Sequence, residues 1–320
     1  MSEPVRQKEG LPAAGRIIDG NVTAAALGAQ LAGEVAALSS GNLRPGLATV
    51  QVGDEYTARA YERRVRRLAD RLSCHYVAET LAADVEEADV LAIVGKLNAD
   101  PRVSGILILR PLPAQITEAD VFRTLDPLKD IEAVHPVNAG LLALGQPRFV
   151  PSTPASSYHL LDRYLEASGR DPRTFYHGRT IVVVGRSNNV GKPAILLGLA
   201  RGGIVVSCDE HAFRAGRLRE FTRQADVLIV AAGVPGLVRA DDVRPGAIVI
   251  DVGINPVRDG GSGRVHLVGD VDFEGVRDKA EAISPVPGGV GPVTDVWLWH
   301  NTVTAAKLAA ELGGYPTSAW

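Results

Sequence analysis

The sequence is poor in the residues that hold small secreted domains and metal centres together. Only two cysteines, Cys74 and Cys208, occur among its 320 residues. Two such distant cysteines make neither a disulfide framework nor a metal-ligand pattern. We therefore expect no metal site and a reducing compartment, which favours the cytoplasm.

Long hydrophobic runs and a strong net charge are also lacking. No uninterrupted stretch of about eighteen apolar residues is present, which argues against a transmembrane helix. Residues 1–15 have no hydrophobic core segment, so we expect a disordered lead-in rather than a signal peptide. A formal charge of -3 provides no field suited to nucleic acid. The expected partner is therefore a small molecule, with neither membrane nor nucleic acid involved.

What the sequence does contain is a balance of 46% hydrophobic and 22% charged residues, typical of a soluble globular protein. The length suits about two domains. Strand-like and helix-like segments alternate, which predicts a two-domain α/β protein with parallel sheets. The expected strands are 46–53, 74–81, 103–113, 179–185, 203–210, 225–233 and 247–253. The expected helices include 20–38, 89–100, 151–165 and 296–313, and an arginine-rich helix that has Tyr61 near its start and ends the segment 52–72.

Two irregular segments interrupt this alternation. Residues 126–140 mix charges, prolines and glycine, and we expect a long loop there. The segment "ISPVPGGVGPVT" at 283–294 is too rich in proline and glycine for a helix or a central strand. A rigid loop of this kind brings backbone groups close to a bound ring. The domain boundary is expected near 148–152, and the last helix is free to fold back onto the first domain.

The segment "VVVGRSNNVGKP" is typical of a dinucleotide-binding turn. Gly185 ends a buried strand and Gly191 opens a helix, so backbone N–H groups at the helix N-terminus can meet a pyrophosphate. The spacing differs from the common G-x-G-x-x-G, and a tight turn without a ligand is the alternative interpretation.

An acidic pair, Asp209 and Glu210, follows about 20 residues later, at the end of the next strand, where a carboxylate accepts hydrogen bonds from the adenosine ribose. A carboxylate there also repels the 2′-phosphate of NADP, which favours NAD. Arg186 argues the other way, because its guanidinium can meet that phosphate. NADP therefore stays open.

Several motifs together resemble the bifunctional methylenetetrahydrofolate dehydrogenase/methenyltetrahydrofolate cyclohydrolase family. The similarity runs nearly end to end and is carried by "IIDG", "VGD" with Tyr61, "GILILRPLP", "KDIEAVHPVNAG", "PSTP", "VVVGRSNNVGKP", "IDVGIN", "GDVDF" and "PVPGGVGPVT".

The resemblance implies a folate domain at 16–150 plus 295–320 and a Rossmann-type NAD(P)-binding domain at 151–294. It also implies a homodimer that binds a tetrahydrofolate derivative. The substrate-binding residues it implies are Tyr61, Glu132, Pro285, Pro287, Gly288 and Gly289. The cofactor-binding residues it implies are Thr153, Gly185, Arg186, Ser187, Val190, Gly191, Asp209, Glu210, Ala232, Gly233, Gly253, Ile254 and Thr294.

The sequence departs from the family pattern at the catalytic positions. Val65 stands where the family has a lysine four residues after the tyrosine, and Leu109 stands where the family has the glutamine that supports it. Ala58 replaces a serine, and Glu132 replaces the pterin-holding aspartate of "KDVDG". The catalytic set to consider is therefore Tyr61, Val65, Leu109 and Glu132. Arg64 and Arg66 flank Val65. An alternative is that one of these arginines replaces the function of the lysine.

Loss of the lysine and the glutamine together indicates a site changed as a unit. Hydride transfer depends mostly on aligning two bound partners, whereas water attack and ring opening need a proton shuttle. We therefore expect an NAD-preferring methylenetetrahydrofolate dehydrogenase with impaired cyclohydrolase activity. The alternatives are a divergent paralogue acting on another substrate in secondary metabolism, and a non-catalytic protein that binds folate or nucleotide.

Overall fold

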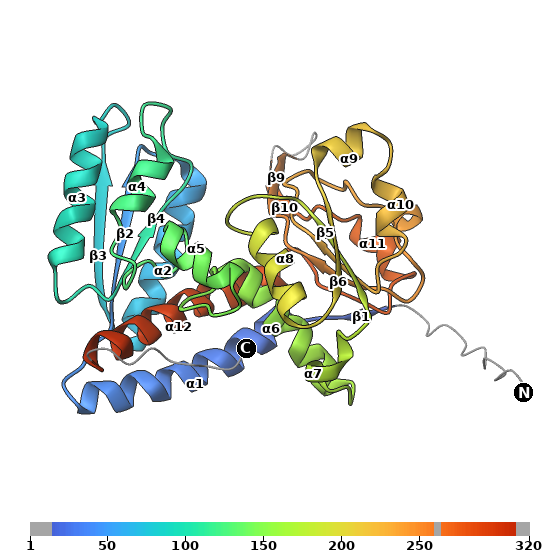
Figure 1. Cartoon of the computed structure of the whole chain (residues 1–320), viewed down its shortest axis with the longest axis horizontal. Coiled ribbons are helices and arrows are strands. Elements are labelled where there is room, and N and C mark those ends of the chain that lie inside the picture. The colour runs from blue at the N-terminus through green and yellow to red at the C-terminus, as the bar shows by residue number, and fades with distance from the viewer. Residues whose placement is uncertain (1–14, 259–263, 312–320) are drawn as a thin grey trace, which may run out of the picture.

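The computed structural model describes residues 15–258 and 264–311, which form two α/β lobes side by side (Figure 1). The expected lead-in at 1–15 falls outside these residues except for Gly15. The first lobe has a three-stranded parallel sheet in the order β3-β2-β4. Its elements are α1 (Gly20–Ser40), β2 (Gly46–Val52), α2 (Tyr56–Leu72), β3 (His75–Leu81), α3 (Glu87–Ala99), β4 (Gly105–Ile108), α4 (Glu118–Thr124) and α5 (Pro136–Ala143).

The second lobe has a six-stranded parallel sheet in the order β1-β11-β8-β7-β5-β6. Its strands are β1 (Arg16–Ile17), β5 (Thr180–Val184), β6 (Ile204–Cys208), β7 (Val227–Val230), β8 (Ile248–Asp251) and β11 (Ala282–Ile283), and β9 (Asn255–Arg258) pairs with β10 (Val265–Val268) as an antiparallel ribbon. Its helices are α6 (Ser152–Ala167), α7 (Pro172–Phe175), α8 (Gly191–Ala200), α9 (Glu210–Arg214), α10 (Leu218–Thr222), η1 (Ala240–Asp242) and α11 (Phe273–Arg277). The predicted two-domain α/β class with a doubly wound parallel sheet is confirmed.

Several strands of both sheets are short, apolar and buried on both faces. All residues of β2, β4, β7 and β8 are buried, as a parallel sheet covered by helices requires. Helix α2 is amphipathic instead, with its buried residues at helical spacing. They are Ala58, Val65, Leu68, Ala69 and Leu72.

The last helix, α12 (Val290–Ala310), connects the two lobes, because it contacts α6, α1, α2 and strands β2 and β4. Strand β1 also crosses the boundary, since it comes first in the chain yet pairs with β11 of the second sheet. The two lobes are therefore joined by chain segments that lie far apart in the sequence. The division into 16–150 plus 295–320 and 151–294 remains a prediction.

Two expected loops contain helical residues, so those predictions were wrong in part. Helix α12 begins at Val290, inside the segment expected to be non-helical, because Pro292 falls in the first turn, where N–H groups have no helical partner. Helix α5 begins at Pro136, inside the expected loop 126–140, where the His135 Nδ1 atom accepts a bond from the Val137 N–H. Proline is favoured at such a first position.

Helix α1 qualifies the expectation that no helix can span a membrane. By length and mean hydropathy it is the one helix among residues 15–258 and 264–311 that is long and apolar enough to cross a bilayer. Its polar residues interrupt every apolar run, which is why the sequence pattern did not reveal it. A single helix of this kind is weak support for membrane insertion, and α1 packs along α12 through Leu27, Leu31 and Val35.

Candidate active site

A cavity of about 400 Å³ lies between the two lobes and gathers residues from both. The first lobe contributes the start of α2, the end of β4 and Glu132. The second contributes the turns after β5 and β8. The cavity brings together these residues singled out from the sequence: Tyr61, Leu109, Glu132, Thr153, Val190, Ile254 and Thr294.

Tyr61 lies on this wall, one turn after the start of α2. Its ring is covered by the Arg64 guanidinium, whose central carbon lies 5.1 Å from the ring centre. Burial raises the pKa of the Tyr61 hydroxyl well above its ordinary value, and the charges of Glu132 and Asp295 raise it further. Tyr61 is therefore a neutral, half-buried aromatic platform suited to stacking against a flat ligand.

Val65, at the position of the family lysine, does not line the cavity among the described residues. It is completely buried in the core of the first lobe. Its carbonyl oxygen accepts a hydrogen bond from the Trp299 indole at 3.2 Å. Leu109 belongs to the same core cluster, although its side chain also borders the cavity. Apolar packing thus occupies the two positions at which the resemblance implies a lysine and a glutamine.

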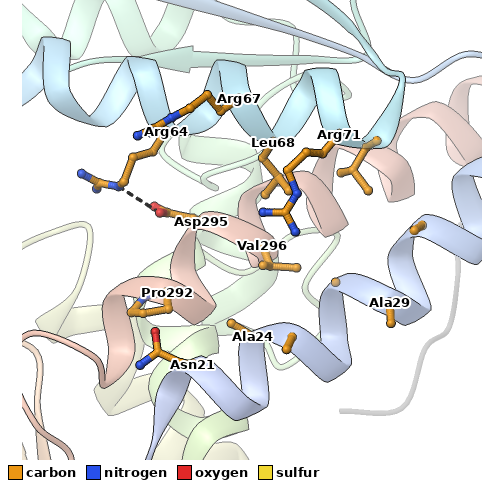
Figure 2. A pocket seen from close by; sticks show the side chains of 14 residues that line it. Asn21, Ala24, Ala29, Arg64, Arg67, Leu68, Arg71, Pro292, Asp295 and Val296 are labelled. Carbon is orange, nitrogen blue, oxygen red and sulfur yellow. Dashed lines mark hydrogen bonds and ion pairs between the residues drawn. The ribbon is translucent and has the colours of Figure 1, made fainter.

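Arg64, one residue earlier, does line the cavity. Its Nε atom donates to the Asp295 carboxylate at 2.9 Å (Figure 2). Arg66 turns away, pairs with Glu62 and covers the Tyr76 ring. Of the two flanking arginines, only Arg64 is placed to meet a substrate.

Asp295 is a site residue that the sequence analysis missed. It enters the cavity from the second turn of α12, and its Oδ1 atom is buried without a hydrogen-bond partner. Burial raises the pKa of this carboxyl, opposed by the charges of Arg64 and Arg67. A lone carboxylate inside the apolar segment "PVTDVWLW" was the available signal.

Glu132 is held by a loop built around the buried Asp130. The Asp130 carboxylate accepts the N–H groups of Val134 and His135, at 3.1 and 2.9 Å. Ala133 adopts a φ of 49°, a left-handed conformation that favours the glycine of the "KDVDG" pattern. Ala133 therefore holds a backbone conformation that a glycine would adopt without strain.

The Glu132 carboxylate is itself held by Ser152. Its oxygens accept the Ser152 N–H at 3.2 and 3.3 Å, and the Ser152 hydroxyl donates a short hydrogen bond. Burial raises the pKa of Glu132 to about 7, although Ser152 and the Arg110 charge oppose the shift. Glu132 can therefore present either a carboxylate or a carboxylic acid to a heteroaromatic ring near neutral pH.

The predicted nucleotide turn has the close backbone contacts that a dinucleotide site requires. A Cβ on Gly185, whose φ is +113°, would lie 2.1 Å from the Ala231 oxygen, and one on Gly191 would lie 2.2 Å from the Gly185 oxygen. The Ser187 hydroxyl accepts the N–H groups of Val190 and Gly191 at 3.2 and 3.4 Å. These residues lie at the carboxyl edge of the sheet, at the N-terminus of α8, where a pyrophosphate binds in such folds.

Asn189, in the same turn, is another residue that the sequence analysis did not single out. Its Oδ1 atom is buried, lacks a hydrogen-bond partner and belongs to a residue of the cavity wall. A buried amide oxygen without a donor loses its hydration. A carboxamide or hydroxyl of a bound nicotinamide nucleotide would supply that donor, so the residues present fit this cofactor.

Two buried aspartates hold the neighbouring loops in place. Asp270 accepts the N–H groups of Ala232 and Gly233 at 2.6 and 2.8 Å, and Asp251 accepts that of Gly253 at 3.0 Å. These three predicted cofactor residues therefore form a continuous edge beside β7 and β8. The motifs "GDVDF" and "IDVGIN" supply this pair, because Asp270 is the second residue of the first motif and Asp251 is the second residue of the other.

Asp209 and Arg186 face each other at the end of β6, with 2.9 Å between Arg186 Nη1 and Asp209 Oδ2. Asp209 also caps α9 by accepting the N–H groups of His211 and Ala212. Glu210 instead forms an exposed pair with Arg214. Of the predicted acidic pair, Asp209 has the fixed orientation that ribose recognition requires.

The segment containing Pro285, Pro287, Gly288 and Gly289 borders a second cavity of about 510 Å³, which shares Arg64, Ile254 and Asp295 with the first. Gly20 approaches this loop closely. Its N–H donates to the Gly288 oxygen at 2.8 Å, and a Cβ there would lie 1.7 Å from the Gly289 oxygen. The motifs "IIDG" and "PVPGGVGP" thus contact each other directly.

Comparisons with known proteins point to one family. The family model for the tetrahydrofolate dehydrogenase/cyclohydrolase catalytic domain matches residues 18–132, and that for its NAD(P)-binding domain matches residues 151–310. A bifunctional protein FolD 3 of Rubrobacter xylanophilus is 67% identical over 297 residues, covering 92% of this chain and 93% of that protein. A bifunctional protein FolD 2 of Geobacter metallireducens is 41% identical, covering 92% and 98%.

Solved structures of enzymes from the same family are also similar to this chain. The Campylobacter jejuni methylenetetrahydrofolate dehydrogenase/cyclohydrolase is 35% identical with a TM-score of 0.83, covering 92% of this chain and 100% of that one. The Trypanosoma brucei enzyme, complexed with NADP cofactor and inhibitor, is 33% identical with a TM-score of 0.85, covering 93% and 99%.

Proposed function

Because the chain belongs to the tetrahydrofolate dehydrogenase/cyclohydrolase family, we propose that it transfers a hydride from 5,10-methylenetetrahydrofolate, or a closely related one-carbon adduct, to a nicotinamide cofactor. We further propose that its cyclohydrolase activity is lost or strongly impaired. The observation that carries this proposal is the complete burial of Val65 in the core, with Leu109 in the same cluster.

The retained residues support hydride transfer by alignment. Tyr61 offers a stacking surface, Glu132 a hydrogen-bonding group for the pterin, and the turns after β5 and β8 the opposite wall of the same cavity. A bound nicotinamide supplies the hydride acceptor. When a reduced folate is enclosed between these walls, its reacting carbon is aligned with the nicotinamide. This alignment contributes much of the rate enhancement of such reactions.

Opening the methenyl ring with water needs a group that gives and takes a proton. Val65 and Leu109 cannot do so. Arg64 donates hydrogen bonds, but an arginine keeps its proton in proteins. Positioned acid–base groups contribute about 10²–10⁴-fold, so we expect cyclohydrolase activity reduced by about that factor. Apart from Glu132, which is assigned to the pterin, Asp295 beside Arg64 is the carboxyl of the described cavity wall that can exchange a proton.

We propose NAD as the preferred cofactor, because the Asp209 carboxylate is held by the N-terminus of α9. A carboxylate in this orientation accepts the ribose hydroxyls and repels a 2′-phosphate. Arg186 is paired with Asp209 and would have to leave it to bind that phosphate. The preference for NAD over NADP is therefore expected to be moderate.

The decisive assay mixes purified protein with 5,10-methylenetetrahydrofolate and either NAD or NADP. Formation of reduced cofactor and hydrolysis of the methenyl product are followed separately. We expect reduction with a higher kcat/KM for NAD, and little acceleration of hydrolysis. Absence of reduction with both cofactors, despite cofactor binding by calorimetry, contradicts the dehydrogenase proposal and supports another substrate or a binding role.

A variant with Val65→Lys and Leu109→Gln tests the assignment of the lost step. Cyclohydrolase activity should rise, because a lysine near Tyr61 regains a glutamine partner. Leu109→Gln alone is the control, since it buries an amide without that partner. Substantial hydrolysis by the unaltered protein, abolished by Asp295→Asn, would show instead that Asp295 has taken over the proton transfer.

A further inference from the structure

Asp295 differs from the other carboxylate of the active-site cavity because one of its oxygens is uncommitted. The described part of the cavity wall contains two carboxylates, Glu132 and Asp295. Both Glu132 oxygens accept hydrogen bonds from Ser152. Asp295 Oδ2 accepts the Arg64 Nε–H at 2.9 Å, whereas Oδ1 is buried without a hydrogen-bond partner. A buried carboxylate oxygen of this kind is costly, and a positively charged ligand would relieve that cost.

Asp295 also lies close to the surface on which a flat substrate would stack. Burial raises the pKa of the Tyr61 hydroxyl, and the Asp295 charge adds to the rise. The Arg64 guanidinium that covers the Tyr61 ring is the same group that holds the Asp295 carboxylate (Figure 2). Val190, in the nucleotide turn, belongs to the same cavity. A substrate stacked on Tyr61 therefore has Asp295 beside it, in the cavity that the nucleotide turn also borders.

The negative charge of Asp295 acts inside the cleft more strongly than the positive charge of Arg64. The exposed fraction of the side chain is 19% for Asp295 and 45% for Arg64, so water screens the guanidinium more. Burial raises the pKa of the Asp295 carboxyl, but the charges of Arg64 and Arg67 oppose that rise and favour the ionised form. Arg64 therefore keeps a carboxylate in a poorly hydrated position without cancelling its charge.

Hydride transfer from a methylene bridge between two nitrogens places a positive charge on the substrate. The C–H bond breaks, and the hydride leaves with both bonding electrons for the nicotinamide ring, which is cationic before the step and neutral after it. A lone pair of one nitrogen forms a C=N bond with the bridge carbon, so the methenyl product carries a charge that both nitrogens share. A fixed negative charge beside that carbon stabilises the transition state more than the neutral substrate.

We propose that the Oδ1 atom of Asp295 contacts the one-carbon bridge and stabilises the positive charge that forms on it. Asp295 is thus a catalytic residue for the hydride transfer, and Arg64 is the positioning residue that holds it. The inference rests on the proposed function and adds electrostatic stabilisation to the alignment of the two bound partners. Stabilising the cationic product also makes its attack by water less favourable, in line with the proposed weak cyclohydrolase activity.

The test uses Asp295→Asn, which keeps the shape of the side chain and removes its charge. Stopped-flow measurements without cofactor, in mildly acidic buffer where the methenyl ring hydrolyses slowly, give dissociation constants for cationic 5,10-methenyltetrahydrofolate and neutral 5,10-methylenetetrahydrofolate. We expect the unaltered protein to prefer the cation. The variant should lose about tenfold of that preference while its affinity for the neutral ligand stays the same. The single-turnover rate of hydride transfer should fall by a similar factor.

Asp120→Asn is the matched control, because Asp120 also pairs with an arginine, Arg123 at 2.8 Å, but lies on α4 and does not line the cavity. It should change neither the preference nor the rate. If Asp295→Asn keeps the preference, or loses affinity equally for both ligands, the inference is overturned and the dehydrogenase proposal stands. Loss of the preference without turnover by the unaltered protein supports the role of the Asp295 charge and overturns the proposed reaction.

Discussion

Arg64 and Val65 are adjacent in the chain, yet α2 directs their side chains to different environments. Val65 lies on the buried face with Leu68 and Ala69, whereas Arg64 projects past Tyr61 to Asp295. Relative to the family pattern predicted from the sequence, the charge at the cleft therefore lies one position earlier and is carried by a guanidinium instead of an ammonium. A guanidinium retains the ability to hold an anion but not the ability to exchange a proton.

Glu132 makes the stability of the protein depend on pH in a direction opposite to that of an ordinary ion pair. Its pKa of about 7 is above the ordinary value of 4.5, so the folded state binds its proton more tightly than the unfolded state. This contribution to stability is fully present below pH 4.5 and is lost as the pH rises through 7. The shift corresponds to roughly 3 kcal/mol.

Replacing Glu132 with glutamine should therefore remove this pH dependence. Relative to the variant, the unaltered protein should lose roughly 3 kcal/mol of unfolding free energy between pH 4.5 and 8, measured by urea denaturation. The exposed Glu86, replaced in the same way, serves as the control. Parallel pH profiles for the Glu132 variant and the unaltered protein would contradict the raised pKa.

At the scale of elements, the substrate cleft depends on the contact between the start of α1 and the loop before α12. Gly20 donates to Gly288, and the Gly289 oxygen occupies the space that a side chain at position 20 would need. Since the same loop borders the second cavity, any displacement there changes the cleft. Glycine is required at position 20 because the backbone of the loop lies too close for a side chain, and not because the chain needs flexibility there.

Gly20→Ala should destabilise the protein by about 1–3 kcal/mol, as overpacking does, and should also raise the KM for substrate. Thermal unfolding and steady-state kinetics measure the two effects. Gly33→Ala is a matched control in the same helix, because a Cβ there meets nothing within 4 Å. That control should gain about 0.5–1 kcal/mol from helix propensity. Equal behaviour of the two variants would refute the close contact.

At the scale of the whole molecule, the site belongs to neither lobe alone. Tyr61, Leu109 and Glu132 come from the first lobe, while Val190 and Ile254 come from the second. Helix α12 contacts both lobes and carries Thr294 and Asp295. Ligand binding between lobes is the usual position for such pockets, and it makes the relative placement of the lobes part of the chemistry.

We propose that the protein is a cytoplasmic homodimer, as the resemblance to its family implies. Light scattering after size-exclusion chromatography should give a mass of about twice the 33.8 kDa of one chain. Dilution over a wide concentration range should leave that mass unchanged if the dimer is tight. A mass of one chain at all concentrations would contradict the proposal.

Much of the architecture is predictable because local rules and tertiary structure agree. Buried strands such as β5 and β7 can be predicted from short apolar runs that end at or near glycines. The first turn of α12 was missed because proline and glycine suggest a loop, although proline is acceptable in a first turn. The start of α5 was missed for the same reason, since His135 and Pro136 form its N-terminus.

Residue identities and the backbone constraints at glycines and prolines were enough to predict the family and the two α/β units, and to find Val65 and Leu109 where the family pattern predicts a lysine and a glutamine. What surrounds these two positions depends instead on how the chain folds. Arg64 and Asp295 are 231 residues apart, and no local pattern predicts that α2 and α12 bring them together. The cavity lined by Arg64, Arg67 and Arg71 likewise exists only because α1, α2 and α12 enclose it.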